Sequence, residues 1–290
     1  MRVKWLIAGY GSEDRRKKQT RLCYAAQEAG AEAEVIPYDD LLNSIYEKST
    51  EQACIYVDGP IMLTLRVPRT RPFWIPGSWH DPEQYRCMSY YANWGKYITQ
   101  QHYAFMPVRE LRRRAEWVYE EFGGDKRQVF IRPDYGEKSF TGKVIAEENF
   151  KKWWAFDDIE QLDPKTCVVV SPCKNLTREY RLVISDSKVV TGSSYYVDGH
   201  HIEENLNLQD DRDLIIEFAE KVASDEPPNL PPVYVMDIAK EVEDSEVRYS
   251  VLEVGCAAAA GFYEADYVAI AKAITEQAEK EYYSYQYMAD

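Results

Sequence analysis

The sequence predicts a mixed fold, in which an open α/β domain with a βαβ sheet precedes an α+β region with antiparallel sheets. Apolar runs alternate with one helical stretch over residues 3–57, which is typical of βαβ units. Beyond about residue 125, short apolar runs follow one another through turns, which indicates antiparallel strands. The chain has 290 residues, enough for about two domains.

Glycines mark the ends of the first elements. A strand over 3–8 ends before the turn GYGS, a helix follows over about 13–29, and Gly30 stops it. Strands are predicted over 34–37 and 53–57. The turn lacks the third glycine of a dinucleotide-binding fingerprint, so a tight βα turn is the simpler interpretation. The turn still lies at the carboxyl end of a strand, where open α/β sheets bind ligands.

The remaining elements are predicted from apolar periodicity and from turn residues. Residues 66–107 are rich in proline and aromatic residues and are predicted to form an ordered connection. We place the domain boundary near residue 105. Helices are predicted over 108–122, about 147–154, 211–223 and about 266–282. Strands are predicted over 129–132, 143–145, 167–171, a hairpin that turns at 185–187, 233–239 and 247–254.

The composition excludes several classes of protein. Lysine and arginine total 35 against 49 aspartates and glutamates, a net charge of −14 that argues against general nucleic-acid binding. There is no run of eighteen apolar residues and no signal-peptide pattern, so no membrane span is expected and a cytoplasmic location is predicted. The six cysteines form no CxxC pair. The adjacent His200 and His201 are predicted to lie in a surface loop.

The strongest chemical signal is the pair Asp237 and Glu253. A hairpin folded about Ser245 would place these two residues opposite each other, with Cβ atoms about 5 Å apart. Both interrupt apolar strands, so burying them unpaired would be costly. Either Mg²⁺, which takes carboxylate and phosphate oxygens, or an arginine or lysine next to each carboxylate would offset their charge.

A second signal is a set of cations around a turn-rich loop. Arg132 ends a strand, Lys138 lies in the loop PDYGEKSFTG, and Lys143 begins the next strand. Cations within and on both sides of such a loop can hold a polyphosphate, although a solvated loop is the simpler interpretation of the loop alone. Glu179 and Arg181 share one face of a later strand, as a structural pair or as a ligand clamp.

Taken together, the order of these pieces resembles that of the ATP-grasp superfamily. The nearest similarity is to its mostly phage and bacterial clade in which arginine replaces the usual strand lysine. The resemblance rests on VFIRPDYGEKSFTGKVI, REYRLVISDSKVVTGSSYY, VYVMDIA, VLEVGCAAAAGFY and DPEQYRCMSYYANWGKYI, and it spans roughly residues 80–285. It implies a pre-ATP-grasp domain over 1–105 and an ATP-grasp domain over 106–290, with a small lobe at about 125–172 and a large lobe at about 173–290.

The resemblance also implies roles for individual residues. Arg132 would contact the α-phosphate and the adenine side, Lys138 would reach the β- and γ-phosphates, and Arg181 would face the γ-phosphate. Asp237 and Glu253 would hold Mg²⁺. The segment 170–174 would be the hinge that reads adenine. The other implied ATP-binding residues are Ser139, Lys143, Ser171, Cys173, Lys174 and Glu179.

The implied reaction activates a carboxylate with ATP and joins it to an amine, releasing ADP and phosphate. A kinase on the same scaffold and a non-catalytic nucleotide-binding module are the alternatives. Gly255 stands where the family usually has a metal-binding asparagine, which leaves a second Mg²⁺ open, and Cys256 is a weak candidate nucleophile. Small or peptide-like carboxylates and amines are the expected substrates, and the resemblance allows a homodimer. The arginines of RVPRTR either hold an anionic substrate or form a solvated turn.

Overall fold

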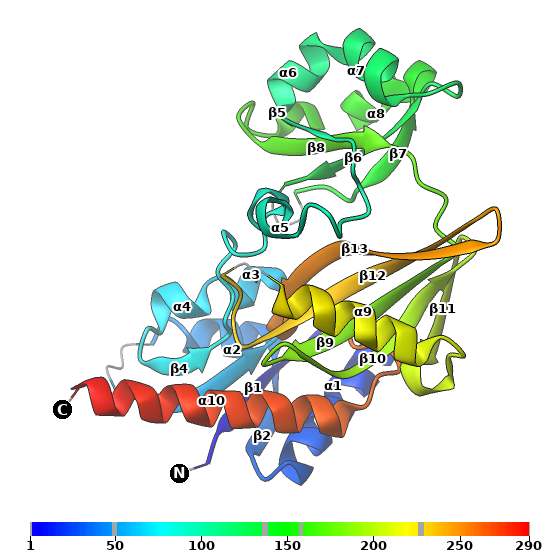
Figure 1. Ribbon diagram of the computed structural model, residues 1–290. Helices are drawn as coiled ribbons and strands as arrows, with labels where there is room; N and C mark the ends of the chain where they lie inside the picture. The colour runs from blue at the N-terminus through cyan, green and yellow to red at the C-terminus, as the bar shows by residue number, and fades with distance from the viewer. Residues whose placement is uncertain (1, 48–50, 135–138, 157–158, 226–228, 290) are drawn as a thin grey trace.

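The structure is a computed structural model that describes residues 2–47, 51–134, 139–156, 159–225 and 229–289. Three sheets organise the described part of the chain. Figure 1 shows the small antiparallel sheet set apart at the top, the five-stranded sheet in the middle and the N-terminal sheet below it. The predicted mixed fold with an N-terminal βαβ unit and later antiparallel sheets is therefore confirmed.

The N-terminal sheet is parallel, with the strand order β2-β1-β3-β4. Between β1 and β2 lies helix α1, whose first turn is capped by the Ser12 side chain and which ends before Gly30 at φ +90°. The strand β4 was not predicted, because proline within an apolar run argues against a strand. The strands of this sheet and α1 are β1 (Lys4–Gly9), α1 (Glu13–Glu28), β2 (Glu32–Pro37), β3 (Ala53–Asp58) and β4 (Trp74–Gly77).

The five-stranded sheet is antiparallel, with the order β11-β10-β9-β12-β13. Helix α9 (Arg212–Ser224) packs against β10 and β12. Its N-terminal Asp211 accepts from Lys240 of β12 at 2.6 Å, so α9 covers the face opposite to that of Asp237. The strands are β9 (Arg178–Ser185), β10 (Lys188–Val197), β11 (His200–Asn205), β12 (Val233–Glu243) and β13 (Glu246–Cys256).

The small sheet is antiparallel with the order β5-β8-β6-β7, and it has its own core around Trp153 and Trp154. The helix predicted over 108–122 is two helices, because the backbone leaves helical geometry at Arg114. The elements are β5 (Ala104–Pro107), α6 (Val108–Arg113), α7 (Ala115–Phe122), β6 (Gln128–Pro133), β7 (Lys143–Ala146), η1 (Glu147–Asn149), α8 (Phe150–Phe156), η2 (Ile159–Gln161) and β8 (Cys167–Pro172). The boundary placed near residue 105 stays a prediction.

The C-terminal helix α10 (Tyr267–Ala289) joins the other two sheets. It packs against α1, β3 and β4 and also against β9, β10 and β12 (Figure 1). Trp5 donates to Thr275 at 3.1 Å, and one continuous apolar core spans both sheets. The remaining helices are α2 (Tyr38–Ser44), α3 (Ile61–Thr64), α4 (Val67–Thr70), α5 (Cys87–Trp94), η3 (Leu206–Leu208) and η4 (Ala257–Ala259).

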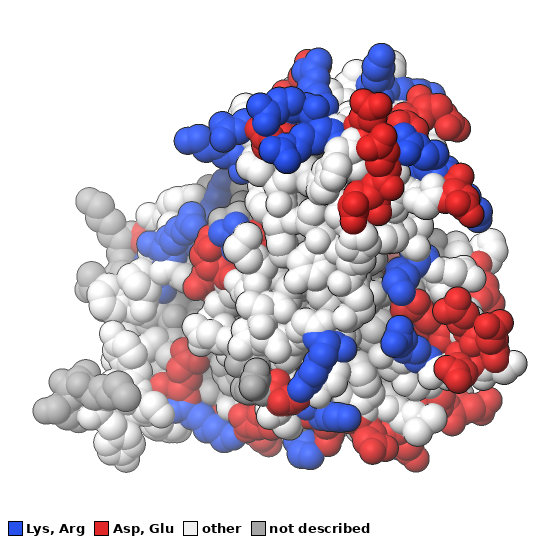
Figure 2. Space-filling view, turned by 45° about the horizontal axis from the view of Figure 1, so that its top comes forward, with Lys and Arg blue, Asp and Glu red and all other residues white. Residues whose placement is uncertain are grey.

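Two surface features follow from this arrangement. The prediction of a loop at His200 and His201 was wrong, because both begin the edge strand β11, where they are exposed. On the face shown in Figure 2, many lysines and arginines gather toward the top, while most acidic groups lie toward the right. Among the described helices, none combines the length and the apolar character that crossing a membrane requires.

Candidate active site

A cleft of about 800 Å³ lies between the small sheet and the five-stranded sheet. One wall comes from β6, β7 and the loop before β7, and the other comes from β9, β10 and β13. Residues 173–177 connect the two sheets and supply part of the lining. A large concave site between two sheets is the default location for a small-molecule ligand.

Arg132 crosses this cleft from one sheet to the other. Alternate residues of β6 face the small core, which leaves Phe130 and Arg132 on the side of the cleft. The Arg132 guanidinium donates to the Leu252 carbonyl at 3.1 Å and lies 3.3 Å from Glu253 Oε1. Its side chain is only 13% exposed, so the structure places a desolvated cation at the inner end of the cleft.

The predicted opposition of Asp237 and Glu253 is confirmed by the register of β12 and β13. The hairpin turns at Asp244 and Ser245, both with positive φ, and its regular register would place Asp237 opposite Leu252. A β-bulge between Asp237 and Ile238 shifts the register by one residue and brings Glu253 opposite Asp237 instead. Bulges commonly aim a side chain beside an active site, and this one brings two acids to one face.

Each of these acids is paired with an arginine. Arg181 donates to both Asp237 oxygens, at 2.8 and 2.7 Å, in a bidentate pair whose carboxylate side chain is 4% exposed. The Arg181 guanidinium also lies next to the stacked rings of Tyr195 and Tyr263, at 5.5 and 5.3 Å from their centroids. Arginine pairing, the alternative to a metal, is therefore observed in this structure for both acids.

Glu179 adds a third carboxylate to the same face of the sheet. Tyr195 Oη donates to Glu179 at 2.6 Å and lies 3.3 Å from Asp237 Oδ2. Burial raises the pKa of the Glu179 carboxyl, the Tyr195 hydrogen bond lowers it, and the nearby charges of Asp237 and Glu253 raise it further. The described residues thus bring three carboxylates and two arginines together on this face of the sheet.

The raised pKa of Glu179 predicts how stability depends on pH. The folded state holds this proton more tightly than the unfolded chain, whose glutamate pKa is about 4.3. The contribution of Glu179 to stability is therefore fully present below the pKa of the unfolded chain, and it is lost as the pH rises through the pKa of the folded state. We expect Glu179→Gln to raise the Tm by about 2 °C at pH 7.5 and to lose this advantage at pH 4. Thermal unfolding across pH 4–8 measures this, and an advantage that grows toward pH 4 would contradict it.

The predicted nucleotide-binding residues fall into separate groups. Lys143, Lys174 and Glu179 line the cleft together with Arg132 and Glu253. Ser171 is fully buried inside β8, and neither it nor the exposed Cys173 lines the cleft. The structure therefore places the first part of the predicted hinge in a strand. Ser139 is exposed outside the lining, and Lys138 lies outside the described residues.

A small cavity of about 50 Å³ adjoins the cleft at Glu253. It is lined by Arg181 and Asp237, by Gly255, and by His80 and Cys256, which come from distant parts of the chain. Burial raises the pKa of Cys256 to about 12, which argues against a nucleophilic thiolate. Burial lowers the pKa of His80 to about 4, and its Nδ1 lies 2.7 Å from Thr64 Oγ1, so the ring is neutral at pH 7.

The donor set of Asp237 and Glu253 fits Mg²⁺. Their carboxylates are oxygen ligands on directly opposed residues, and Mg²⁺ commonly takes one or two carboxylates together with substrate phosphates. Within the described ranges, no group of three or more His, Cys, Asp and Glu residues is arranged to hold a metal without such a substrate. Gly255 pairs with Val235 and contributes no side-chain oxygen.

Sequence reasoning missed Tyr195, Tyr263 and His80. The two tyrosine rings stack at 4.9 Å and hold Arg181, although they lie 68 positions apart in the chain. Tyr195 is the extra, unpaired residue of a bulge in β10, where the regular alternation of side chains is interrupted. An aromatic residue in an apolar strand is usually core, so no local signal marked either tyrosine.

Comparisons with known proteins agree with this geometry. The model of the ATP-grasp domain of the R2K clade, family 2, matches residues 110–273. The fold is similar to a D-cycloserine synthetase, DcsG, with a TM-score of 0.58, 15% identity and coverage of 95% of this chain and 99% of the other. A RimK-domain ATP-grasp protein from Sphaerobacter thermophilus gives a TM-score of 0.60 at 12% identity, covering 95% and 98%.

A third similar structure is the D-alanine–D-alanine ligase of Bacillus anthracis, with a TM-score of 0.56, 12% identity and full coverage of both chains. At these identities the structures support the fold alone. No curated protein sequence matches the chain. The family model covers more than half of the chain and includes all described lining residues of the cleft except Gln100, both arginine–carboxylate pairs and the bulged hairpin. The chain therefore belongs to the ATP-grasp family, in family 2 of the R2K clade.

Proposed function

We propose that the protein is an ATP- and Mg²⁺-dependent ligase that joins a carboxylate to an amine and releases ADP and phosphate. The observation that carries this proposal is two arginine–carboxylate pairs in an ATP-grasp domain, one lining the cleft (Arg132 and Glu253) and one lining the small cavity that adjoins it (Arg181 and Asp237). Structures with similar folds include a D-alanine–D-alanine ligase complexed with ATP and the ligase PsnB complexed with Mg and ADP. They support nucleotide and Mg²⁺ as ligands.

Different residues in and beside the cleft would bind different parts of Mg²⁺-bound ATP. Arg132 and Lys143 would contact the polyphosphate, with Lys138 from the adjoining loop, and residues 174–177 would lie along the base. Asp237 and Glu253 would hold Mg²⁺, which supplies charge neutralisation on the phosphates. Arg181, which pairs with Asp237 in this structure, would contact the γ-phosphate.

The reaction itself needs positioning more than a protein nucleophile. A substrate carboxylate oxygen attacks the γ-phosphorus, and the bond to the β,γ-bridging oxygen breaks, releasing ADP. The amine then attacks the acyl carbon, a C–N bond forms, and phosphate leaves as the amine loses a proton. Arg181 would stabilise the transferred phosphoryl group, while the stacked rings of Tyr195 and Tyr263 next to it would hold its guanidinium in place.

This proposal predicts ADP and phosphate, not AMP and pyrophosphate, as the products from ATP. We expect substrate-dependent ADP release that requires an amine, with a product whose mass is the sum of both substrates less water. Chromatography of the nucleotides and mass spectrometry of the products measure these. AMP formation would contradict the proposal, and a phosphorylated product formed without any amine would indicate a kinase instead.

A further inference from the structure

A third cavity, of about 440 Å³, lies between the N-terminal sheet and the segment that follows β13. Its N-terminal side includes Tyr10 and Arg15 near the end of β1 and Asp58 at the end of β3. Its other side includes Glu203 of β11 and Tyr263. A volume of this size is typical of a small-molecule site.

The topology of the N-terminal sheet makes this a natural ligand position. The chain passes from β1 through α1 to β2 on one side and then crosses to β3 on the other side of β1. The carboxyl ends of β1 and β3 therefore form a topological switch point, where open α/β sheets bind ligands in a crevice. The backbone N–H of Gly59 donates to the Ala258 carbonyl at 2.9 Å, which holds the end of β3 beside the segment that follows β13.

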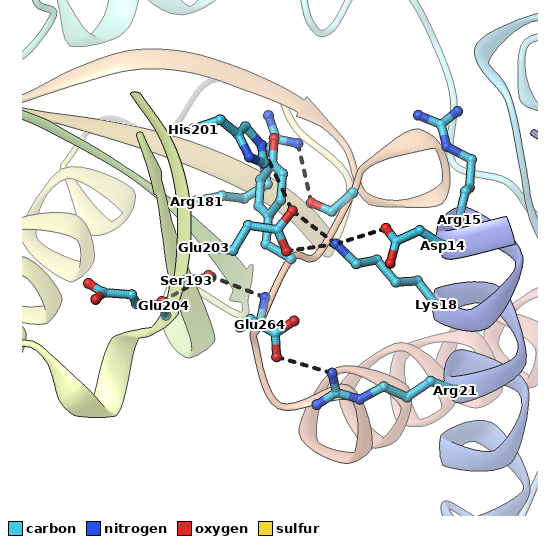
Figure 3. Close-up of polar contacts among 12 residues, drawn as sticks. Asp14, Arg15, Lys18, Arg21, Arg181, Ser193, His201, Glu203, Glu204 and Glu264 are labelled. Atoms are coloured by element: carbon cyan, nitrogen blue, oxygen red, sulfur yellow. Dashed lines mark hydrogen bonds and ion pairs between the residues drawn. The ribbon is translucent and has the colours of Figure 1, made fainter. Parts of the chain in front are cut away.

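Three cations of α1 face this region, and they differ in their partners. Lys18 lies 2.6 Å from Glu203, and Arg21 lies 3.5 Å from Glu264 (Figure 3). Arg15 stacks over the Tyr10 ring at 5.1 Å but has no carboxylate partner among the described residues. Figure 3 shows its guanidinium apart from those two ion pairs. Lys18 and Arg21 thus connect α1 to Glu203 and Glu264 through ion pairs. The guanidinium of Arg15 is not used in such a pair, so its charge is available to an anionic group of a ligand.

Asp58 is the complementary group. It is partly buried, and in the described part of the chain no lysine or arginine pairs with it and no donor binds it. Burial raises the pKa of its carboxyl well above the usual range, as expected for a carboxyl without a cationic partner. A ligand ammonium would supply the missing positive charge.

The cavity also leads toward the proposed reaction centre. Ala259 and Ala260 line both this cavity and the small cavity beside Asp237. Arg181 donates to the Gly261 carbonyl at 3.3 Å and packs against Tyr263, which lines the 440 Å³ cavity. A ligand bound between Arg15 and Asp58 would therefore lie next to the groups assigned to phosphoryl transfer.

We propose that this cavity binds the amine substrate, and that this substrate is a small zwitterion of the amino-acid type, with its ammonium on Asp58 and its carboxylate on Arg15. The inference rests on the proposed ligase function. The two unpaired, oppositely charged groups select for a molecule that carries both charges, since a ligand with only one of them leaves the other protein group without a partner.

The test titrates free L- and D-amino acids singly into the full chain with Mg²⁺ and a non-hydrolysable ATP analogue. Each amino acid that binds is titrated again as its N-acetyl form and as its carboxamide form. Binding is measured by calorimetry. The variants are Arg15→Met and Asp58→Asn. Their matched controls are Arg16→Met, one residue along the same helix, and Asp40→Asn, an exposed acid on α2; both lie outside the cavity lining. Thermal unfolding verifies that each variant is folded.

We expect at least one free amino acid to bind. Its N-acetyl and carboxamide forms should bind about tenfold more weakly. Arg15→Met should lose about tenfold in affinity and no longer discriminate against the carboxamide, and Asp58→Asn should no longer discriminate against the N-acetyl form. Both variants and both controls should keep the wild-type affinity for ATP.

Two results would overturn the inference while leaving the proposed function intact. One is a protein that binds Mg²⁺ and ATP but none of the amino acids. The other is amino-acid affinity that folded Arg15→Met and Asp58→Asn both retain in full. A folded wild-type protein without ATP binding would overturn the proposed function and this inference with it.

Discussion

Replacing Asp237 with asparagine is expected to reduce ATP turnover by about 10³-fold. Asp237 is the more deeply buried of the two proposed Mg²⁺ ligands and the bidentate partner of Arg181. Asparagine keeps the shape of the side chain but removes its charge, so the site loses affinity for a divalent cation. The assay is substrate-dependent ADP release at saturating ATP, expressed per folded molecule.

The same substitution should also destabilise the protein, which calls for a matched control. Removing one partner of a buried ion pair costs about 3–5 kcal/mol, because a buried charge remains uncompensated. Asp211 is a comparable acid that accepts from Lys240 at 2.6 Å and from Tyr249 at 2.7 Å on the opposite face of the sheet. Asp211→Asn should lower stability yet keep turnover per folded molecule. Equal activity in folded Asp237→Asn would contradict its assignment.

Replacing Arg132 with methionine is expected to weaken ATP binding by about ten- to a hundredfold. The guanidinium is the one positively charged group that the structure shows joining β6 to β13 across the cleft, among the described residues. Its charge-assisted contacts to a phosphate would be worth about 1.5–3 kcal/mol. The ATP affinity of Arg132→Lys should lie between those of wild type and Arg132→Met. Lysine keeps the positive charge, but its ammonium lacks the planar fork that reaches both the Leu252 carbonyl and a second acceptor.

Arg127 offers the control for this series. It lies just before β6 and makes two 2.7 Å contacts with Glu147 outside the cleft lining. Arg127→Met removes the same charge from the same sheet and should leave ATP affinity within about twofold of wild type. Calorimetric titration of each variant with Mg²⁺ and ATP measures the series. Similar losses in Arg127→Met and Arg132→Met would indicate a general charge effect instead of a specific contact.

Much of the fold follows from local pattern. The helix α1 begins at a capping serine and ends at a glycine with positive φ, and both signals are written in the sequence. Elements that depend on distant partners were missed. The strand β4 contains Pro76 and is held by pairing with β3, and β11 begins with two exposed histidines and is held by pairing with β10. Their stability comes from tertiary pairing, which local propensity does not encode.

In the candidate site, too, some features could be predicted from the sequence and others depend on the folded chain. The opposition of Asp237 and Glu253 followed from counting along a hairpin, although its physical cause is a bulge that the count did not include. The arginine partner of each acid comes from another strand, so no local pattern could assign the pairs. The contribution of Tyr263 depends on stacking with Tyr195, and the cavity near Asp58 depends on how two sheets meet. Both arise only once the chain is folded.

The most direct test of the central claim is a calorimetric titration of the wild-type protein and of folded Asp237→Asn with ATP, with and without Mg²⁺. We predict that Mg²⁺ strengthens ATP binding by wild type at least about tenfold and that most of this gain is absent in the variant. ATP binding that is unaffected by Mg²⁺, or no ATP binding by folded wild-type protein, would contradict the account and leave the two arginine–carboxylate pairs as structural contacts.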